Sequence, residues 1–138
     1  MSAMVLFASA LHWPAHAQAP KDEAAYYTDA CYHPETGDLL GDRLALVKSS
    51  DGYVVRFQSA EGELGREMKG KAAVNDGMLS FDVDTADGKR LPFKGKVTPQ
   101  EITGRFGNNR PSAIGKPDVH WRRVAINEFN IGPCKAGP

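Results

Sequence analysis

The stretch 67–97, which reads EMKGKAAVNDGMLSFDVDTADGKRLPFKGKV, alternates apolar and polar residues in runs separated by turn residues. Such alternation is typical of strands with one buried face, because successive side chains of a strand point to opposite sides. The dipeptides Asp76-Gly77 and Asp87-Gly88 separate the runs Glu67–Val74, Met78–Asp84 and Arg90–Val97. Because Asp-Gly between alternating runs favours a hairpin turn, the stretch predicts successive antiparallel strands.

The same pattern continues on both sides of this stretch. Further strands are predicted at Arg43–Lys48, Tyr53–Ser59, Ile102–Phe106 and Val119–Val124. The sequence MKGKA at Met68–Ala72 returns as FKGKV at Phe93–Val97, which is expected of successive hairpins in one up-and-down sheet. Only the segment Lys21–Ala30 has a composition that favours a helix.

Large aromatic residues and glycines fall on the same face of these strands when side chains are assigned by the period of two. This inner face holds Phe57, Phe81, Phe93 and Phe106 together with Gly70, Gly95 and Gly104. Glycine within a strand marks a sharp bend or a close approach, and repeated bends coil a sheet into a barrel. We therefore expect an all-β fold, in which an antiparallel up-and-down meander forms a small calycin-like barrel or half-barrel. The resemblance to calycins is architectural and carries over no site residues.

The outer face of the same strands carries charges of both signs. Lysines and aspartates alternate from strand to strand, at Lys69, Lys71, Asp82, Asp84, Lys94 and Lys96. Opposite charges on neighbouring antiparallel strands attract one another, so we expect these side chains to pair across the sheet. A charge ladder of this kind indicates a solvated face and not a site.

The first residues, 1–17, have the features of a signal peptide. They contain an apolar run from Met4 to Leu11 and end in Ala15-His16-Ala17, the small-x-small pattern at which signal peptides are cleaved. The run is shorter than the roughly 20 residues that span a bilayer. No Lys or Arg precedes it, so a buried N-terminal element is the alternative. We expect a single all-β domain at 18–138, periplasmic or secreted, without membrane insertion.

The two cysteines of the chain, Cys31 and Cys134, lie near the ends of this domain. In an oxidising compartment an even pair is most simply one disulfide, which here would join the two termini. Closing a loop of this length removes unfolded-state entropy worth roughly 4–5 kcal/mol. A reactive or metal-binding thiol is the alternative, although two cysteines so far apart lack the spacing of a metal site.

The charge balance and the motifs argue against several function classes. With 17 basic and 17 acidic side chains and a pI near 6.9, the chain has no electrostatic feature that favours nucleic acid as a partner. The run from Asp82 to Gly88 begins like a calcium loop, but its glycine falls one position late. No serine lies in a GxSxG setting, and His33 and His120 are the only histidines of the expected mature domain. We therefore expect no enzyme, no cofactor and no metal.

Two sets of residues are candidates for binding. The first lines the inside of the sheet and comprises Phe57, Phe81, Phe93, Phe106, Trp121 and Arg123. Trp121 is expected either to close one end of the sheet, with Arg123 against its ring through a cation–π contact, or to form the floor of a ligand cavity. The second set lies in the long connection Gly107–Pro117, where Asn108, Asn109, Arg110 and Ile114 are candidates for contact with a partner.

These features predict a non-catalytic exported binding module. Its ligand is expected to be small and apolar and to be held inside the sheet. The alternative is a protein-binding inhibitor or immunity-type protein, which acts through its loops on an exported hydrolase or another envelope protein. A hollow interior favours the first hypothesis, and a filled barrel favours the second.

Overall fold

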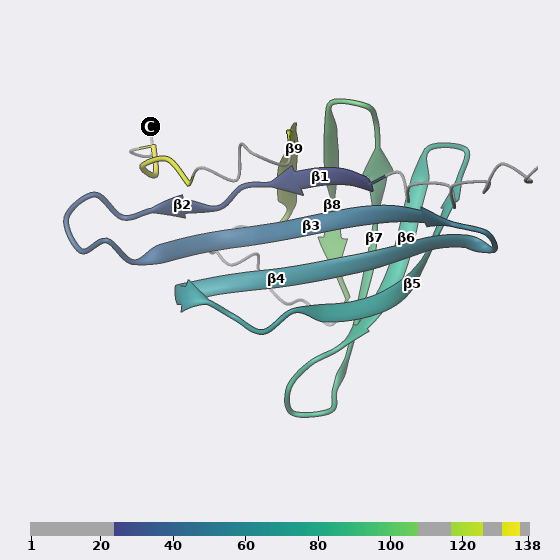
Figure 1. Cartoon of the computed structure of the whole chain (residues 1–138), viewed down its shortest axis with the longest axis horizontal. Coiled ribbons are helices and arrows are strands. Elements are labelled where there is room, and N and C mark those ends of the chain that lie inside the picture. Colours follow the sequence, from purple (N-terminus) through teal and green to yellow (C-terminus); the bar gives the residue numbers. More distant parts are fainter. Residues whose placement is uncertain (1–23, 108–116, 126–130, 136–138) are drawn as a thin grey trace, which may run out of the picture.

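Nine strands make up the part of the chain that the computed structural model describes, which is residues 24–107, 117–125 and 131–135. In chain order they are β1 (Ala24–Thr28), β2 (Cys31–Tyr32), β3 (Leu39–Ser49), β4 (Gly52–Leu64), β5 (Met68–Asn75), β6 (Met78–Asp84), β7 (Arg90–Val97), β8 (Glu101–Phe106) and β9 (Val119–Val124). Neighbouring strands pair antiparallel throughout (Figure 1). The described residues contain no helix that could span a membrane.

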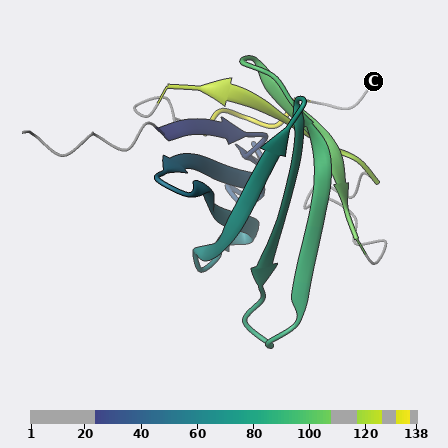
Figure 2. The same ribbon diagram turned by 90° about the vertical axis from the view of Figure 1, so that its right-hand side faces the viewer.

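The sheet closes into an eight-stranded barrel because β1 pairs with strands on both of its sides. Tyr27 stands opposite Leu44 of β3 and also opposite Arg123 of β9. Figure 2 shows β1 in purple between β9 and β3. The short strand β2 adds to β3 as a ninth strand (Figure 1). Closure removes the unpaired edges of these strands, and of the two predicted forms the structure has the closed barrel.

The turn between β5 and β6 shows why Asp-Gly predicts a hairpin. Asn75 stands opposite Met78, so Asp76 and Gly77 are the whole connection. Both have a positive backbone φ, 49° at Asp76 and 75° at Gly77. A two-residue turn of this kind matches the twist of the strands, and few residues besides Asn, Asp and Gly adopt it.

The interior follows the predicted alternation. Leu79, Phe81 and Val83 of β6 are buried, while the residues between them are partly or fully exposed. Gly95 and Gly104 stand opposite each other on β7 and β8. A Cβ on Gly104 would lie 2.6 Å from the Cα of Gly95 and 2.6 Å from Cζ of Phe93. The two glycines therefore let neighbouring strands approach each other beneath an aromatic ring.

The predicted helix at Lys21–Ala30 is wrong where the structure describes it. Ala24–Thr28 forms β1, which pairs with β3 and β9. The alanines favour a helix locally, but Tyr26 and Tyr27 alternate between the outside and the inside of the barrel, and the pairing on both sides outweighs local propensity.

The predicted charge ladder is wrong in its register between β6 and β7. Asp82 stands opposite Pro92, and Asp84 stands opposite Arg90. Arg90 lies 4.0 Å from a carboxylate oxygen of each aspartate, while Lys94 stands opposite Ser80. The connection Thr85–Lys89 sets this register, because it places the last residue of β6 against the first of β7.

A disulfide joins Cys31 to Cys134, as predicted, with the Cα atoms 4.8 Å apart. It fastens the C-terminal segment beside β2. The Tyr32 N–H donates to the carbonyl of Gly132, and the Cys134 N–H donates to the carbonyl of Tyr32, at 2.9 Å each. The predicted signal peptide at 1–17 lies outside the described residues.

Candidate functional site

The aromatic residues predicted to line the interior come together at its centre. Phe57, Phe81, Phe93, Phe106 and Trp121 are all at most 3% exposed. Ring centroids are 4.8 Å apart for Phe81 and Phe93, 5.1 Å for Phe93 and Trp121, and 5.5 Å for Phe57 and Phe106. At such separations aromatic rings are in direct contact. The rings thus pack against one another as a core.

Arg123 does not belong to this cluster. Its Cζ lies 5.5 Å from the ring centroid of Tyr27, so the cation–π contact expected with Trp121 is made with Tyr27 instead. The reason is closure of the barrel, which sets Tyr27 directly opposite Arg123. The Tyr27 hydroxyl donates to the carbonyl of Thr98 at 3.1 Å. Tyr27 and Arg123 therefore cover the end of the barrel next to the β7–β8 turn.

The predicted partner-binding residues Asn108, Asn109, Arg110 and Ile114 lie outside the described residues. The strands on either side of this connection, β8 and β9, are described, and Arg105 forms an ion pair with Asp118 at 2.7 Å between them. Among the residues that the structure describes, no group of three or more His, Cys, Asp or Glu side chains is arranged to hold a metal ion.

A groove on the outer wall of the barrel crosses β1, β3 and β4 and has a volume of about 270 Å³. Its lining residues are Tyr26, Arg43, Leu44, Ala45, Arg56, Gln58 and Glu67. Ala45 stands opposite Tyr26 on one side and Arg56 on the other. A small side chain in a row of large ones leaves a depression in the wall, and this accounts for the groove.

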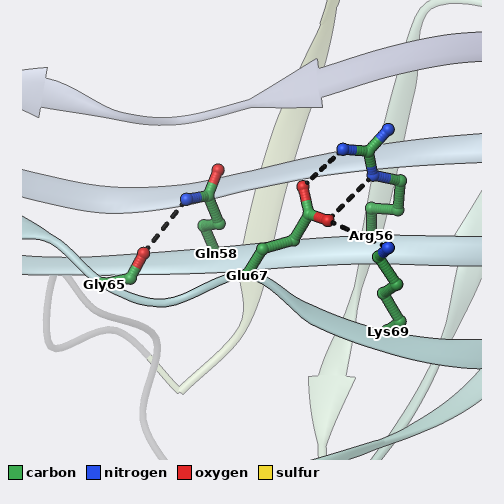
Figure 3. A network of polar contacts seen from close by, with 5 residues as sticks. All are labelled: Arg56, Gln58, Gly65, Glu67 and Lys69. Atoms are coloured by element: carbon green, nitrogen blue, oxygen red, sulfur yellow. Dashed lines mark hydrogen bonds and ion pairs between the residues drawn. The ribbon is translucent and has the colours of Figure 1, made fainter.

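A network of polar contacts borders the groove at β4 (Figure 3). The Arg56 Nε donates to Glu67 Oε1 at 3.0 Å, and the Arg56 Nη2 donates to Glu67 Oε2 at 2.8 Å. Lys69 Nζ lies 3.8 Å from Glu67 Oε1, and Gln58 Nε2 donates to the carbonyl of Gly65 at 3.0 Å. These contacts hold the side chains of Arg56 and Gln58 in defined positions.

The charges of this network stabilise one another. The hydrogen bonds from Arg56 lower the pKa of the Glu67 carboxyl below its usual value. In return, the hydrogen bonds and the negative charge of Glu67 raise the pKa of Arg56. Arg43 differs, because burial lowers its pKa by penalising the charged form. The groove thus holds one guanidinium bound to a carboxylate and a second one partly removed from water.

A second, smaller pocket lies at the opening of the barrel where β4 leads into β5. It has a volume of about 160 Å³ and is lined by Ser59, Gly65, Arg66, Met68, Thr85 and Ala86. The connections β4–β5 and β6–β7 both contribute to it. Neither this pocket nor the outer groove is lined by any ring of the central aromatic cluster.

The sequence pattern predicts only some of the residues that line the outer groove. The period of two places Arg43 and Ala45 on the outer face of one predicted strand, and Arg56 and Gln58 on that of the next. Tyr26 lies in a segment whose composition favours a helix, so the sequence does not place it beside these residues. Glu67 is adjacent to Arg56 only through the pairing of Phe57 with Met68, for which no local sequence signal exists.

The chain was also compared with known proteins. No family model, no curated protein and no solved structure matches it.

Proposed function

We propose that the protein is a non-catalytic exported binding module, which recognises its target on the outer wall of a filled barrel. The target lies against the groove formed by Tyr26, Ala45 and Arg56. The observation that carries this proposal is the contrast between the interior of the barrel and the groove on its outer wall. Five aromatic rings occupy the interior at contact distances, whereas the groove outside is bordered by an arginine in a fixed position.

The placement of titratable groups supports binding rather than catalysis. The His120 ring pairs with the Glu101 carboxylate on the outer wall of β8 and β9, and the side chains are 59% and 43% exposed. A histidine–carboxylate pair contributes to catalysis when it orients toward a nucleophile and a bound substrate. This pair lines neither the outer groove nor the pocket at the opening of the barrel.

Export is supported by two features of different kinds. The apolar N-terminal run with its small-x-small ending is typical of a secretory signal. The Cys31–Cys134 disulfide is compatible with an exported protein, because disulfides persist in oxidising compartments.

A second candidate function is binding of an envelope protein through the loops. The observation that favours it is the 160 Å³ pocket, in which the β4–β5 and β6–β7 connections jointly form the opening of the barrel. An inhibitor or immunity-type protein would use such an end surface, since rigid scaffolds commonly present binding residues on loops.

Site-specific photocrosslinking separates these possibilities. A benzoylphenylalanine is introduced at Lys69, on the rim of the groove and 68% exposed, at Arg66 in the second pocket, or at Lys94 on the β7 wall as the control. We expect crosslinking in the producing cells from position 69 and not from 94. Crosslinking from position 66 alone would favour the loop surface, and a small apolar molecule retained in native mass spectra would favour an internal ligand. Either result, or no adduct at 69, overturns the proposal.

A further inference from the structure

We infer that the outer groove is a carboxylate-binding site, in which the free edge of the Arg56 guanidinium receives the carboxylate of a small organic acid. The inference rests on the proposed function, because it specifies what the groove recognises. It is carried by the geometry of Arg56, by the shape of the groove around Ala45 and by the balance of charge.

Arg56 has donors left after its contacts with Glu67 are made. A guanidinium carries five N–H groups in a planar fork, and Glu67 accepts from Nε and Nη2 only. In Figure 3 the third guanidinium nitrogen points away from Glu67. The edge formed by Nη1 and Nη2 matches a carboxylate in geometry and charge, because two parallel hydrogen bonds form between them.

Glu67 prepares Arg56 for this role. An exposed arginine loses side-chain freedom when it binds a ligand, and this loss weakens the affinity. Here the paired hydrogen bonds at 3.0 and 2.8 Å already orient the guanidinium. The cost of ordering is therefore met when the protein folds, and little of it remains for the ligand.

The charges at the groove favour an anion. Arg43 and Arg56 line it together with Glu67, and Lys69 lies 3.8 Å from Glu67. Two cations thus contact Glu67, and Arg43 adds a further positive charge to the lining of the groove. Burial penalises the positive charge of Arg43 and lowers its pKa, and an anion at close range reduces that penalty.

The size of the groove suits a small acid. Its volume of about 270 Å³ is below the roughly 300–1,000 Å³ of most small-molecule pockets, so it takes one ring-sized group. Tyr26 and Ala45 both line the groove and stand opposite each other on β1 and β3. A flat ring that bears a carboxylate lies against Tyr26 when its carboxylate reaches Arg56.

Titrations followed by amide and arginine Nε NMR signals test the inference on the full mature chain. The probes are benzoate and glucuronate, which distinguish an aromatic acid from a sugar acid, with benzyl alcohol and glucose as their neutral counterparts. We expect at least one acid to shift the signals of β3 and β4, while its neutral counterpart does not. Neutral counterparts that bind as well as the acids would overturn the inference.

Two variants and a matched control make the test specific. Arg56→Lys keeps the positive charge but removes the planar guanidinium, and it should weaken binding of the acid about tenfold, as expected for loss of a charge-assisted hydrogen bond. Ala45→Phe fills the groove and should weaken binding at least as much, because the larger side chain occupies the space of the acid. Lys94→Gln removes a positive charge from another wall and should leave the affinity within about twofold. Far-UV circular dichroism verifies that each variant folds. An unchanged affinity in both Arg56→Lys and Ala45→Phe, or equal weakening in Lys94→Gln, would count against the site.

The failure of this inference is distinguishable from failure of the proposed function. If position 69 crosslinks a target and neither acid binds, the groove is a binding surface for other chemistry and the carboxylate inference is wrong. If an acid binds at Arg56 of the purified chain but position 69 forms no adduct in the producing cells, the groove binds carboxylates and the proposed recognition of a target in those cells is wrong.

Discussion

Arg56 and Glu67 are joined by two hydrogen bonds of 3.0 and 2.8 Å, which connect β4 to the residue that precedes β5. The contact lies on the outer wall, where side-chain exposures are 51% for Arg56 and 30% for Glu67. Solvent screens charges in such a position, so the pair contributes little to global stability. Its main consequence is that the β4–β5 connection is tied to the rim of the groove.

The first prediction concerns the pH dependence of this contact. The pKa of the Glu67 carboxyl is lower in the folded protein than its usual value of 4.5. The contact therefore stabilises the fold fully at a pH above 4.5. This stabilisation is lost as the pH falls through the lowered pKa and the carboxylate takes up a proton. Glu67→Gln should reduce the free energy of unfolding at neutral pH by less than about 1 kcal/mol. Urea unfolding of both proteins over a range of pH measures this, and the difference should shrink in acid. A difference that grows in acid would contradict the assignment.

The second prediction concerns the disulfide. Cys31 and Cys134 are separated by 103 positions, and a cross-link over such a distance restricts the unfolded chain. The double variant Cys31→Ala/Cys134→Ala should lose about 4 kcal/mol of unfolding free energy. Chemical denaturation measures the loss, and the reduced wild type should match the variant. Equal stability of the variant and the oxidised wild type would show that the bond does not constrain the unfolded state.

Much of the barrel was predictable because its strands carry local signals. The alternation in β6 and the Asp76-Gly77 turn act within a few residues, and each is visible in the sequence alone. The strand β1 was not predictable in this way. Its alanines favour a helix, and its strand structure comes from pairing with β3 and β9, which lie far from it in the chain.

The candidate site was less predictable than the fold for the same physical reason. The period of two places Arg56 and Ala45 on the outer faces of their strands, but the groove requires that β1 bring Tyr26 to the other side of Ala45. The aromatic residues of the core were predictable from their period of two. That they contact one another depends on the curvature of the closed sheet, which separate strands do not reveal.

The third prediction concerns the close approach of β7 and β8. A Cβ on Gly95 would lie 2.9 Å from the Cα of Gly104 and 2.9 Å from Cε1 of Phe93. Gly95→Ala should therefore lower the unfolding free energy by roughly 1–3 kcal/mol, as overpacking does in other cores. Gly132→Ala is the matched control, because a Cβ there meets nothing within 4 Å, and it should change stability by less than about 0.5 kcal/mol. Thermal and urea unfolding measure both, and equal effects would contradict the close approach.

The fourth prediction concerns a buried carboxylate. Asp29 Oδ1 accepts a hydrogen bond of 2.7 Å from the Asp42 N–H, while Oδ2 is buried and has no hydrogen-bond partner among the described residues. Burial raises the pKa of Asp29 above its usual value of 3.8. The folded protein thus favours the protonated form, and this contribution to stability is present below pH 3.8 and is lost as the pH rises through the raised pKa.

Asp29→Asn keeps the acceptor for Asp42 and removes the buried charge. At neutral pH the variant should therefore be more stable than the wild type, because burial of an ionised carboxylate costs free energy that a neutral amide avoids. The advantage should disappear as the pH falls through the raised pKa and the wild-type carboxyl takes up its proton. Urea unfolding from about pH 3 to about pH 7 measures the difference. Glu35→Gln, which removes the same charge from an exposed turn, should not reproduce it. An Asp29→Asn variant that is less stable than the wild type at neutral pH would contradict the prediction. It would mean that the negatively charged Asp29 carboxylate stabilises the fold.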